Sequence, residues 1–134
     1  MKKKIISLIV CLLLLTACGT KYETITADTV RELVADNAVI IDVRETNEYE
    51  EGHIEGSVNI PVSKIGNVDY DKDTKIIVYC VSGTRSANAA NELIKLGYTN
   101  VYNLDGGIIN WDEELVVDDV VDGGLEIEDL EIED

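Results

Sequence analysis

Cys80 and Arg85 are the two side chains of this sequence whose types and spacing most directly suggest chemistry. Four residues separate them in the segment Tyr79-Cys80-Val81-Ser82-Gly83-Thr84-Arg85-Ser86. A cysteine thiolate is a strong nucleophile, and the arginine guanidinium is a planar, permanent cation that suits an oxyanion such as a thiosulfonate, phosphate or arsenate. The segment therefore predicts covalent thiol chemistry at an anion site.

The flanking residues indicate how such a site would be built. The apolar run Ile76-Ile77-Val78 predicts a buried strand before the segment, and a helical pattern follows it at residues 87–96. The first N–H groups of a helix have no intrahelical partner, and the helix dipole adds positive potential there. We expect the loop N–H groups to stabilise a Cys80 thiolate, with Gly83 allowing the tight turn. The candidate loop residues are Val81, Ser82, Gly83, Thr84 and Ser86.

The same two residues also have a purely structural interpretation. Most free cysteines are buried and inert, so Cys80 could be a small apolar residue at the end of a strand. Arg85 would then simply face solvent. The close combination of cysteine, glycine and arginine favours the chemical interpretation.

Strand and helix patterns alternate along the rest of the chain. Strands are predicted at residues 38–43, 57–61, 75–79 and 101–104, and a helix capped by Thr26 is predicted to about Asp36. Its buried stripe would be Ala27, Val30, Leu33 and Val34, and that of the helix at 87–96 would be Ala87, Ala90, Leu93 and Ile94. Residues 66–75 are predicted as a polar connector and 108–115 as one or two final helical turns. This alternation predicts an α/β fold, with a mostly parallel sheet and helices on both faces.

Size and charge limit the possible classes of protein. The chain has 134 residues, of which 46% are apolar, enough for one domain with a single core. Its formal net charge is −16. Such a chain repels anionic lipid and nucleic acid, so no nucleic-acid partner is expected.

The first residues resemble an export signal. A basic start, Lys2-Lys3-Lys4, precedes an apolar stretch at residues 5–15 that is too short to span a bilayer. The following Leu15-Thr16-Ala17-Cys18 resembles a bacterial lipobox, which implies a signal peptide at residues 1–17 and a lipid anchor on Cys18. Residues 18–23 would then be the lipidated cysteine and a tether. The protein would lie in the cell envelope, held to a membrane outside the cytoplasm, with a net charge of −19 once the three signal lysines are removed. A plain cleaved signal peptide is the alternative.

Four sequence blocks together resemble the single-domain rhodaneses of the sulfurtransferase family, over roughly residues 24–117. They are Asp42-Val43-Arg44 with Glu48-Tyr49 downstream, Gly52-His53-Ile54-Glu55-Gly56-Ser57-Val58-Asn59-Ile60-Pro61, the loop from Cys80 to Ser86, and Leu104-Asp105-Gly106-Gly107-Ile108-Ile109-Asn110-Trp111. Each block alone is weak, but four in this order are specific. The resemblance implies a five-stranded parallel α/β domain.

The resemblance also implies a mechanism. Cys80 would attack the outer sulfur of a donor such as thiosulfate and then pass the sulfur of its persulfide to cyanide or to a thiol. The loop amides would stabilise the anionic sulfur, and Arg85 would hold the sulfonate end of the donor. No metal or organic cofactor is implied. His53 lies in a turn that the family uses structurally. From the residues themselves, we expect Asp42 and Arg44 to tie the second strand to neighbouring loops, and Glu48 to be an ion-pair partner of Arg44.

Two other functions stay open. The domain could be a carrier that holds a persulfide or an oxyanion for a partner protein with little turnover of its own. It could also be a thiol phosphatase or an arsenate reductase. The related thiol phosphatases have a loop one residue longer and a histidine before the cysteine, whereas Tyr79 precedes Cys80 here.

The C-terminal end departs from the family pattern. Twelve carboxylates and no basic residue occupy residues 112–134, and the chain ends in a tandem repeat, Leu125-Glu126-Ile127-Glu128-Asp129 followed by Leu130-Glu131-Ile132-Glu133-Asp134. We expect residues 118–134 to form a solvated, loosely ordered acidic tail. Such a tail could serve solubility alone, or it could bind a basic protein or divalent cations.

Overall fold

The fold comes from a computed structural model, which describes residues 21–119. The export signal, the lipid anchor on Cys18 and the acidic tail beyond Asp119 are predictions that lie outside the described residues. Within residues 21–119, no helix is both long enough and apolar enough to cross a membrane.

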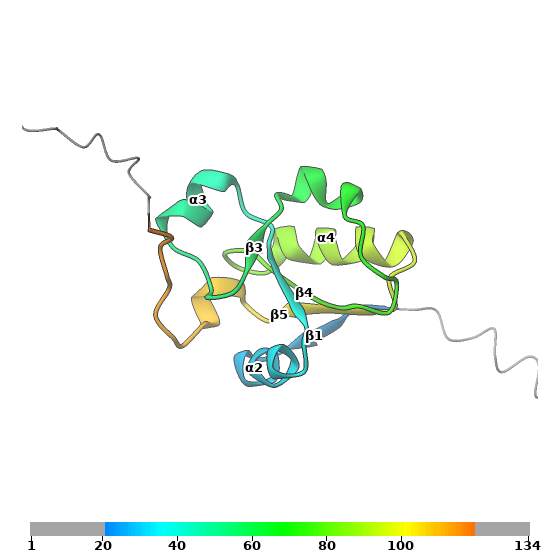
Figure 1. The fold of residues 1–134 in the computed structure, drawn as a ribbon, viewed down its shortest axis with the longest axis horizontal. Coiled ribbons are helices and arrows are strands. Elements are labelled where there is room, and N and C mark those ends of the chain that lie inside the picture. The colour runs from blue at the N-terminus through cyan, green and yellow to red at the C-terminus, as the bar shows by residue number, and fades with distance from the viewer. Residues whose placement is uncertain (1–20, 120–134) are drawn as a thin grey trace, which may run out of the picture.

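A five-stranded parallel sheet forms the centre of the structure (Figure 1). Its strands are β1 (Glu23–Ile25), β2 (Val39–Asp42), β3 (Val58–Asn59), β4 (Lys75–Tyr79) and β5 (Asn100–Leu104), in the spatial order β1-β5-β4-β2-β3. All four pairings between neighbouring strands are parallel. The predicted α/β fold is therefore confirmed, and β4, which leads to Cys80, is the middle strand.

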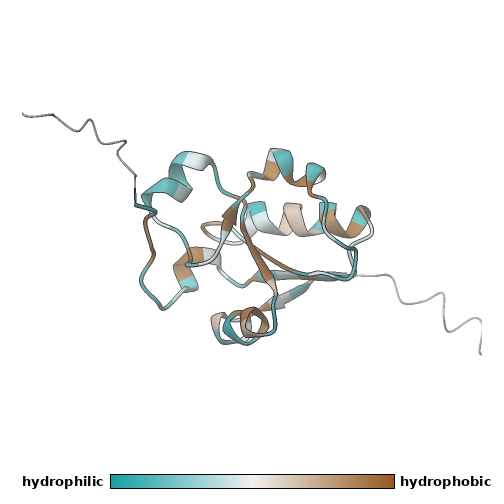
Figure 2. Cartoon of the chain, viewed as in Figure 1, coloured by the Kyte–Doolittle hydropathy of each residue, from teal (hydrophilic) through white to brown (hydrophobic). Residues whose placement is uncertain are grey.

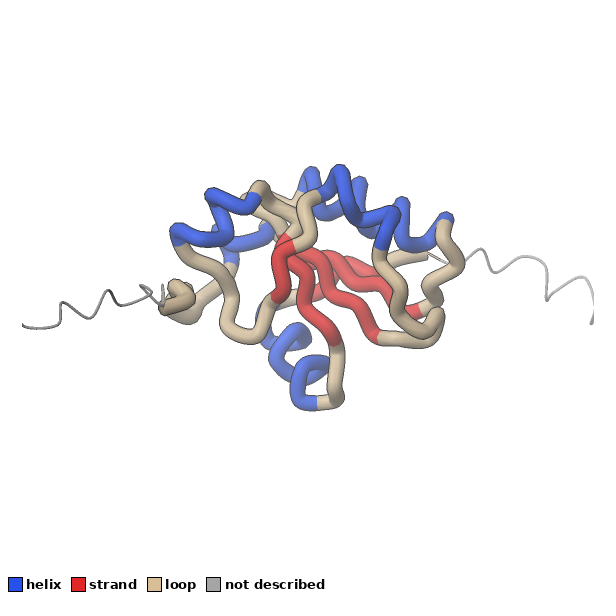
Figure 3. Tube along the Cα trace, turned by 45° about the horizontal axis from the view of Figure 1, so that its top comes forward, coloured by secondary structure: helices blue, strands red, loops and turns tan. Residues whose placement is uncertain are grey.

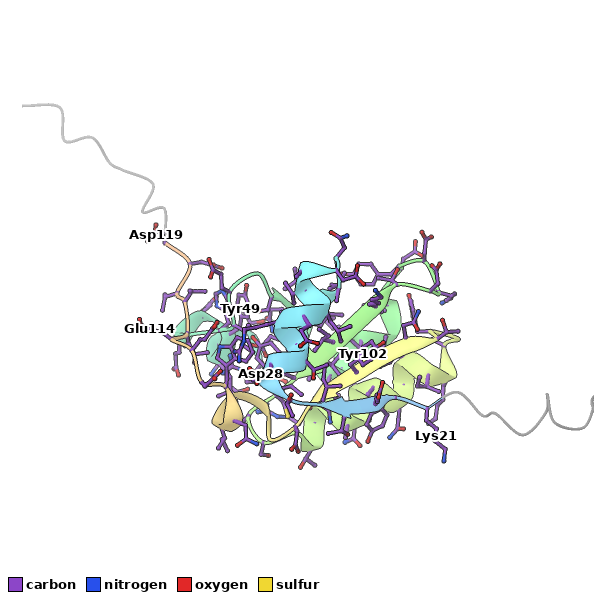
Figure 4. The ribbon with its side chains drawn as sticks, turned by 90° about the horizontal axis from the view of Figure 1, so that it is seen from below. Lys21, Asp28, Tyr49, Tyr102, Glu114 and Asp119 are labelled. Carbon is purple, nitrogen blue, oxygen red and sulfur yellow. The ribbon has the colours of Figure 1, made fainter. Side chains whose placement is uncertain are left out.

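Helices cover both faces of this sheet, as predicted. Helix α4 (Thr84–Lys95) and the 3-10 helix η1 (Val62–Asn67) lie on one face, and α2 (Ala27–Ala35) lies on the other (Figures 1 and 3). Figure 4 shows the same layers from below, with α2 in front of the sheet and α4 behind it. Helix α3 (Thr46–Glu51) and the 3-10 helix η2 (Gly107–Asn110) lie beside the end of the sheet where β4 turns into α4.

Each face of the sheet has its own apolar core. Towards α4 and η1 the core contains Ile41, Val43, Ile65, Ile76, Val78, Cys80, Ala89, Ala90, Leu93, Tyr98 and Val101. Towards α2 it contains Ile25, Val30, Ile40, Ile54, Ile77, Tyr79 and Leu104. Figure 2 shows the contrast between the hydrophobic β2 and the mostly hydrophilic α3. Because neighbouring strand residues point to opposite faces, a continuous apolar strand such as β4 contributes to both cores.

Several local predictions hold, and others need correction. Thr26 caps α2, with its hydroxyl oxygen 3.4 Å from the Thr29 backbone nitrogen. The prediction that Val34 belongs to the buried stripe of that helix is wrong, because 40% of its surface is exposed.

Three segments have a different local structure from the one predicted. Glu23, which is predicted as the end of the tether, instead belongs to β1 with Thr24 and Ile25 and pairs with β5. The start of the polar connector at 66–75 belongs to η1, whose Ile65 is buried in the core. The helical turn after Gly106 ends at Asn110, and Val116 forms an isolated antiparallel bridge with His53.

The backbone of η2 packs closely against the loop after β4. Gly107 has a φ of +58°, and a Cβ atom there would lie 2.4 Å from the carbonyl oxygen of Cys80 and 2.7 Å from that of Val81. The two loop carbonyls accept hydrogen bonds from η2, the Cys80 oxygen from the Ile108 N–H (2.9 Å) and the Val81 oxygen from the Ile109 N–H (3.3 Å). A glycine is therefore required for η2 to approach the loop this closely.

We expect Gly107→Ala to lower the stability of the domain much more than a positive φ alone would. The matched control is Gly56→Ala, because Gly56 has a φ of +80° and a Cβ atom there would meet no other atom within 4 Å. The control should lose about 1–2 kcal/mol from backbone strain, and Gly107→Ala at least about twice as much because the loop must also move. Urea unfolding curves measure both. Equal losses would contradict the close approach of η2 to the loop.

Candidate functional site

Cys80 lies directly after the middle strand of the sheet, at the entrance to α4. β4 ends at Tyr79, and Gly83 forms the N-cap of α4 with a φ of +102°. The thiol is almost completely buried, with 1% of the residue exposed. This position combines the carboxyl end of a central parallel strand with a helix N-terminus, the usual place for anion binding in an α/β fold.

Hydrogen-bond donors surround the sulfur. The Gly83 N–H donates to Cys80 Sγ over 3.1 Å, and the Ser86 hydroxyl oxygen lies 3.4 Å from it. Burial has the largest single effect and on its own raises the pKa of Cys80. The Ser86 hydroxyl and the backbone N–H groups of Ser86, Gly83 and Ser82 oppose it, and the pKa ends below its ordinary value. The loop thus favours a thiolate without a charged partner at the sulfur.

Contacts from outside the loop direct one of its N–H groups at the sulfur. The carbonyls of Cys80 and Val81 accept hydrogen bonds from η2. No peptide bond in the described chain is cis, and in a trans peptide the N–H points opposite to the C=O. Fixing the Val81 carbonyl therefore directs the Ser82 N–H towards the sulfur. The short helix η2 is in this way part of the site.

The Ser86 hydroxyl lies between two acceptors. It is 3.4 Å from Cys80 Sγ and 3.1 Å from the Gly83 carbonyl oxygen, and a hydroxyl can donate to one acceptor at a time. The Gly83 oxygen also accepts from the Ala87 N–H (3.0 Å) and from Asn103 Nδ2 (3.3 Å). Because these two donors satisfy that oxygen, Ser86 is free to donate to a thiolate.

Asn103 is the site residue that the sequence did not reveal. It lies on the same face of β5 as Val101, is 6% exposed, and its Oδ1 has no hydrogen-bond partner within residues 21–119. The available signal was an amide between the apolar residues Val101 and Leu104 of a predicted strand, since buried polar groups usually have a specific partner.

The remaining predicted loop residues form the rim of the site. Ser82 and Thr84 are exposed, and Val81 is half-buried. The structure brings Cys80, Gly83 and Ser86 together directly.

Arg85 forms an ion pair with Glu48. Its Nη1 donates to Glu48 Oε2 over 2.8 Å and its Nη2 to Glu48 Oε1 over 3.0 Å, a two-pronged ion pair between α4 and α3. The Arg85 guanidinium, helped by the Glu45 N–H, lowers the pKa of Glu48 to about 2. The prediction that Glu48 pairs with Arg44 is therefore wrong.

Arg44 instead pairs with Asp42, two residues earlier. Asp42 is fully buried, and Arg44 is 6% exposed. Arg44 Nη2 donates to Asp42 Oδ2 (2.6 Å) and to the Gly52 carbonyl (2.7 Å), and Nε lies 3.0 Å from both carboxylate oxygens. This compact pair braces the chain between β2 and the end of α3, the helix that carries Glu48.

His53 lies in a separate contact with the C-terminal segment. Its Nδ1 is 3.0 Å from the Tyr49 carbonyl oxygen, its ring stacks on the Tyr49 ring at 3.8 Å, and its Nε2 is 3.2 Å from Asp118 Oδ1. Its backbone exchanges two hydrogen bonds with Val116. Figure 4 shows Tyr49 on the side where the chain runs from Glu114 to Asp119. Within the described residues, none of the hydrogen bonds of His53 reaches the Cys80 loop.

Comparisons with known proteins place the chain in one family. Residues 26–114 match the sequence model of the rhodanese-like domain. The chain is 36% identical over 88 residues to thiosulfate sulfurtransferase GlpE of Pseudoalteromonas translucida, covering 64% of this chain and 84% of GlpE. It is 45% identical over 76 residues to the protein YqhL of Bacillus subtilis, covering 55% of this chain and 60% of YqhL, less than two thirds of that relative.

A solved structure shows the same relationship in three dimensions. The crystal structure of a rhodanese-related protein from Thermoplasma volcanium matches with a TM-score of 0.63 at 32% identity, over 72% of this chain and 99% of that chain. The family match covers strands β2 to β5, the Cys80 loop and η2 together. The chain therefore belongs to the rhodanese-like domain family.

Proposed function

We propose that this protein is a sulfurtransferase, which moves a sulfane sulfur from a donor to a thiophilic acceptor through a persulfide on Cys80. One observation carries the proposal. The buried Cys80 sulfur faces the Gly83 N–H and the Ser86 hydroxyl at the N-terminus of α4, and these donors stabilise a sulfur anion.

The first half-reaction loads the sulfur. The Cys80 thiolate attacks the outer sulfur of the donor, a new S–S bond forms, and the S–S bond of the donor breaks. With thiosulfate, the bonding electron pair leaves on sulfite. Charge balances, because thiolate plus thiosulfate dianion gives an anionic persulfide plus sulfite dianion.

The second half-reaction releases the sulfur. An acceptor thiolate or cyanide attacks the outer sulfur of the persulfide, and the bonding electrons return to Cys80 as a thiolate. The loop donors serve both steps, because the persulfide and the thiolate are both sulfur anions at the same place. The covalent intermediate splits one difficult transfer into two.

Two features argue against the phosphatase and arsenate reductase alternatives. The loop between Cys80 and Arg85 is one residue shorter than in the thiol phosphatases of related fold. The Arg85 fork, which an oxyanion would need, holds Glu48 instead. A carrier would load sulfur in the same first half-reaction but would not release it to a small acceptor in the second. An experiment that follows the second half-reaction separately distinguishes the two functions.

We expect the purified chain to gain one sulfur atom on Cys80 when it is incubated with a sulfane donor. Intact-mass measurement detects the gain, and added cyanide should remove it with release of thiocyanate. Cys80→Ser should show neither event. If sulfur is loaded but neither cyanide nor thiols can remove it, the carrier function is favoured. If no sulfane donor loads sulfur onto Cys80, the proposal is refuted.

We also expect the alkylation rate of Cys80 to report the lowered thiol pKa. The thiolate is the reactive form, so the iodoacetamide rate should rise with pH and reach its midpoint below the value of free cysteine. Ser86→Ala removes one donor to the anion, which is worth about 1 kcal/mol, and should move the midpoint to higher pH. Since a more basic thiolate is also more nucleophilic, the rate at neutral pH should fall about threefold.

Ser82→Ala is the matched control for this measurement, because the exposed Ser82 side chain makes no hydrogen bond among the described residues. A midpoint that is the same in all three proteins would contradict the role of Ser86.

A further inference from the structure

The Arg85–Glu48 ion pair bears on which donor the site accepts. A free arginine at the mouth of the Cys80 loop would attract a dianion such as thiosulfate. Here both terminal nitrogens of Arg85 are engaged, at 2.8 and 3.0 Å, by the two oxygens of one carboxylate. Paired, charge-assisted hydrogen bonds of this kind are among the stronger polar contacts in proteins, so the nearest cation to the loop is already neutralised.

Glu48 is held in place independently of Arg85. Its Oε2 also accepts the Glu45 backbone N–H over 2.9 Å, as part of the capping box at the start of α3. Helix α3 follows directly after the buried Asp42–Arg44 pair, which also holds the Gly52 carbonyl at the end of the helix. The carboxylate is therefore pre-positioned, and its pKa of about 2 keeps it ionised at every working pH.

Arg85 nevertheless belongs to the site electrostatically. Its pKa is raised first by the hydrogen bonds to Glu48, and the Cys80 thiolate is among the other charges that raise it. About a third of each side chain of the pair is exposed, 38% for Arg85 and 30% for Glu48. A donor that approaches Cys80 from this side meets a neutral ion pair.

We infer that Glu48 determines donor specificity: it occupies Arg85 and so selects persulfides of the form R–S–SH over thiosulfate. This inference rests on the proposed sulfur transfer by Cys80. Thiosulfate must either compete with the Glu48 carboxylate for the already paired charge of Arg85 or enter without a cation, in a chain of net charge −16. A persulfide presents no sulfonate and has no need of Arg85.

The persulfide reaction also balances without an additional reactant. The Cys80 thiolate bonds to the outer sulfur of R–S–SH, and the donor S–S bond breaks. The electron pair leaves on R–S⁻, and Cys80 retains the persulfide. The leaving group is a thiolate monoanion, so no dianion has to bind or leave in this strongly acidic chain.

The test compares two donors on the full-length chain. The rate constant for loading sulfur onto Cys80 is measured in single turnovers by rapid quench and intact mass, once with thiosulfate and once with cysteine persulfide made from cystine and sulfide. The wild type should load from cysteine persulfide with the higher second-order rate constant.

Glu48→Gln should release the Arg85 guanidinium from its ion pair. The glutamine side chain still has an oxygen that can accept the Glu45 N–H. We expect loading from thiosulfate to rise at least about tenfold, a gain of about 1.4 kcal/mol, and loading from cysteine persulfide to change less than about twofold. The matched control is Glu51→Gln, which removes the same charge from the same helix at an exposed side chain without an ion pair among the described residues. It should leave the ratio of the two rates unchanged.

The double variant Glu48→Gln/Arg85→Met completes the cycle. If the gain with thiosulfate acts through Arg85, the second substitution should abolish it. An unchanged donor ratio in Glu48→Gln, a parallel fall of both rates, or a wild type that prefers thiosulfate would each overturn the inference. Failure of the wild type to load from either donor would instead refute the proposed function.

Discussion

The orientation of the peptide groups after Cys80 is the constraint on which the rest of the site depends. The Val81 carbonyl oxygen accepts a hydrogen bond from the Ile109 N–H of η2, so the opposite side of that planar peptide, the Ser82 N–H, faces the sulfur. The sulfur anion is then stabilised by fixed dipoles that need no rearrangement when the charge forms. Gly107 makes this possible, because any side chain there would collide with both carbonyls.

A second constraint is the buried Asp42–Arg44 pair at the end of β2. Breaking one partner of a buried ion pair leaves an uncompensated charge in the interior, so the chain between β2 and α3 has little freedom. Arg44 also binds the Gly52 carbonyl, which fixes the far end of α3. The position of Glu48, and through it that of Arg85, therefore follows from a contact that involves neither the thiol nor the solvent.

Much of the fold could be predicted from the sequence because its signals are local. The apolar run of β4, the Thr26 cap of α2 and the amphipathic pattern of α4 each depend on neighbouring residues alone. Strand β1 could not be predicted in this way. Its three residues are too few to show a hydrophobic pattern, and they form a strand only because they pair with β5.

The site shows the same division between local and long-range information. Cys80, Gly83 and Ser86 lie within one short segment, and their contacts follow from its turn into α4. The partner of Arg85 lies 37 positions away in the chain, and two acidic residues compete for two arginines. Asp42 is two residues from Arg44 and buried with it, which leaves Glu48 on the outer side for Arg85. Which arginine pairs with which carboxylate depends on burial, and the order of charges in the sequence does not specify burial. Asn103 was missed for the same reason, because its place in the site depends on the hydrogen bond that its Nδ2 donates to the distant Gly83 carbonyl.

The two constraints separate thiol reactivity from donor recognition. The thiolate is stabilised by short-range dipoles at 3.1 to 3.4 Å, which salt and surface charge screen very little. The ion pair at the mouth is partly exposed and acts on incoming anions, so its effect depends on the charge and shape of the donor. Substitutions at the rim can therefore change which sulfur compound enters without altering the nucleophile. The residue that pairs with Arg85 can therefore change the preferred donor while the Cys80 loop stays the same.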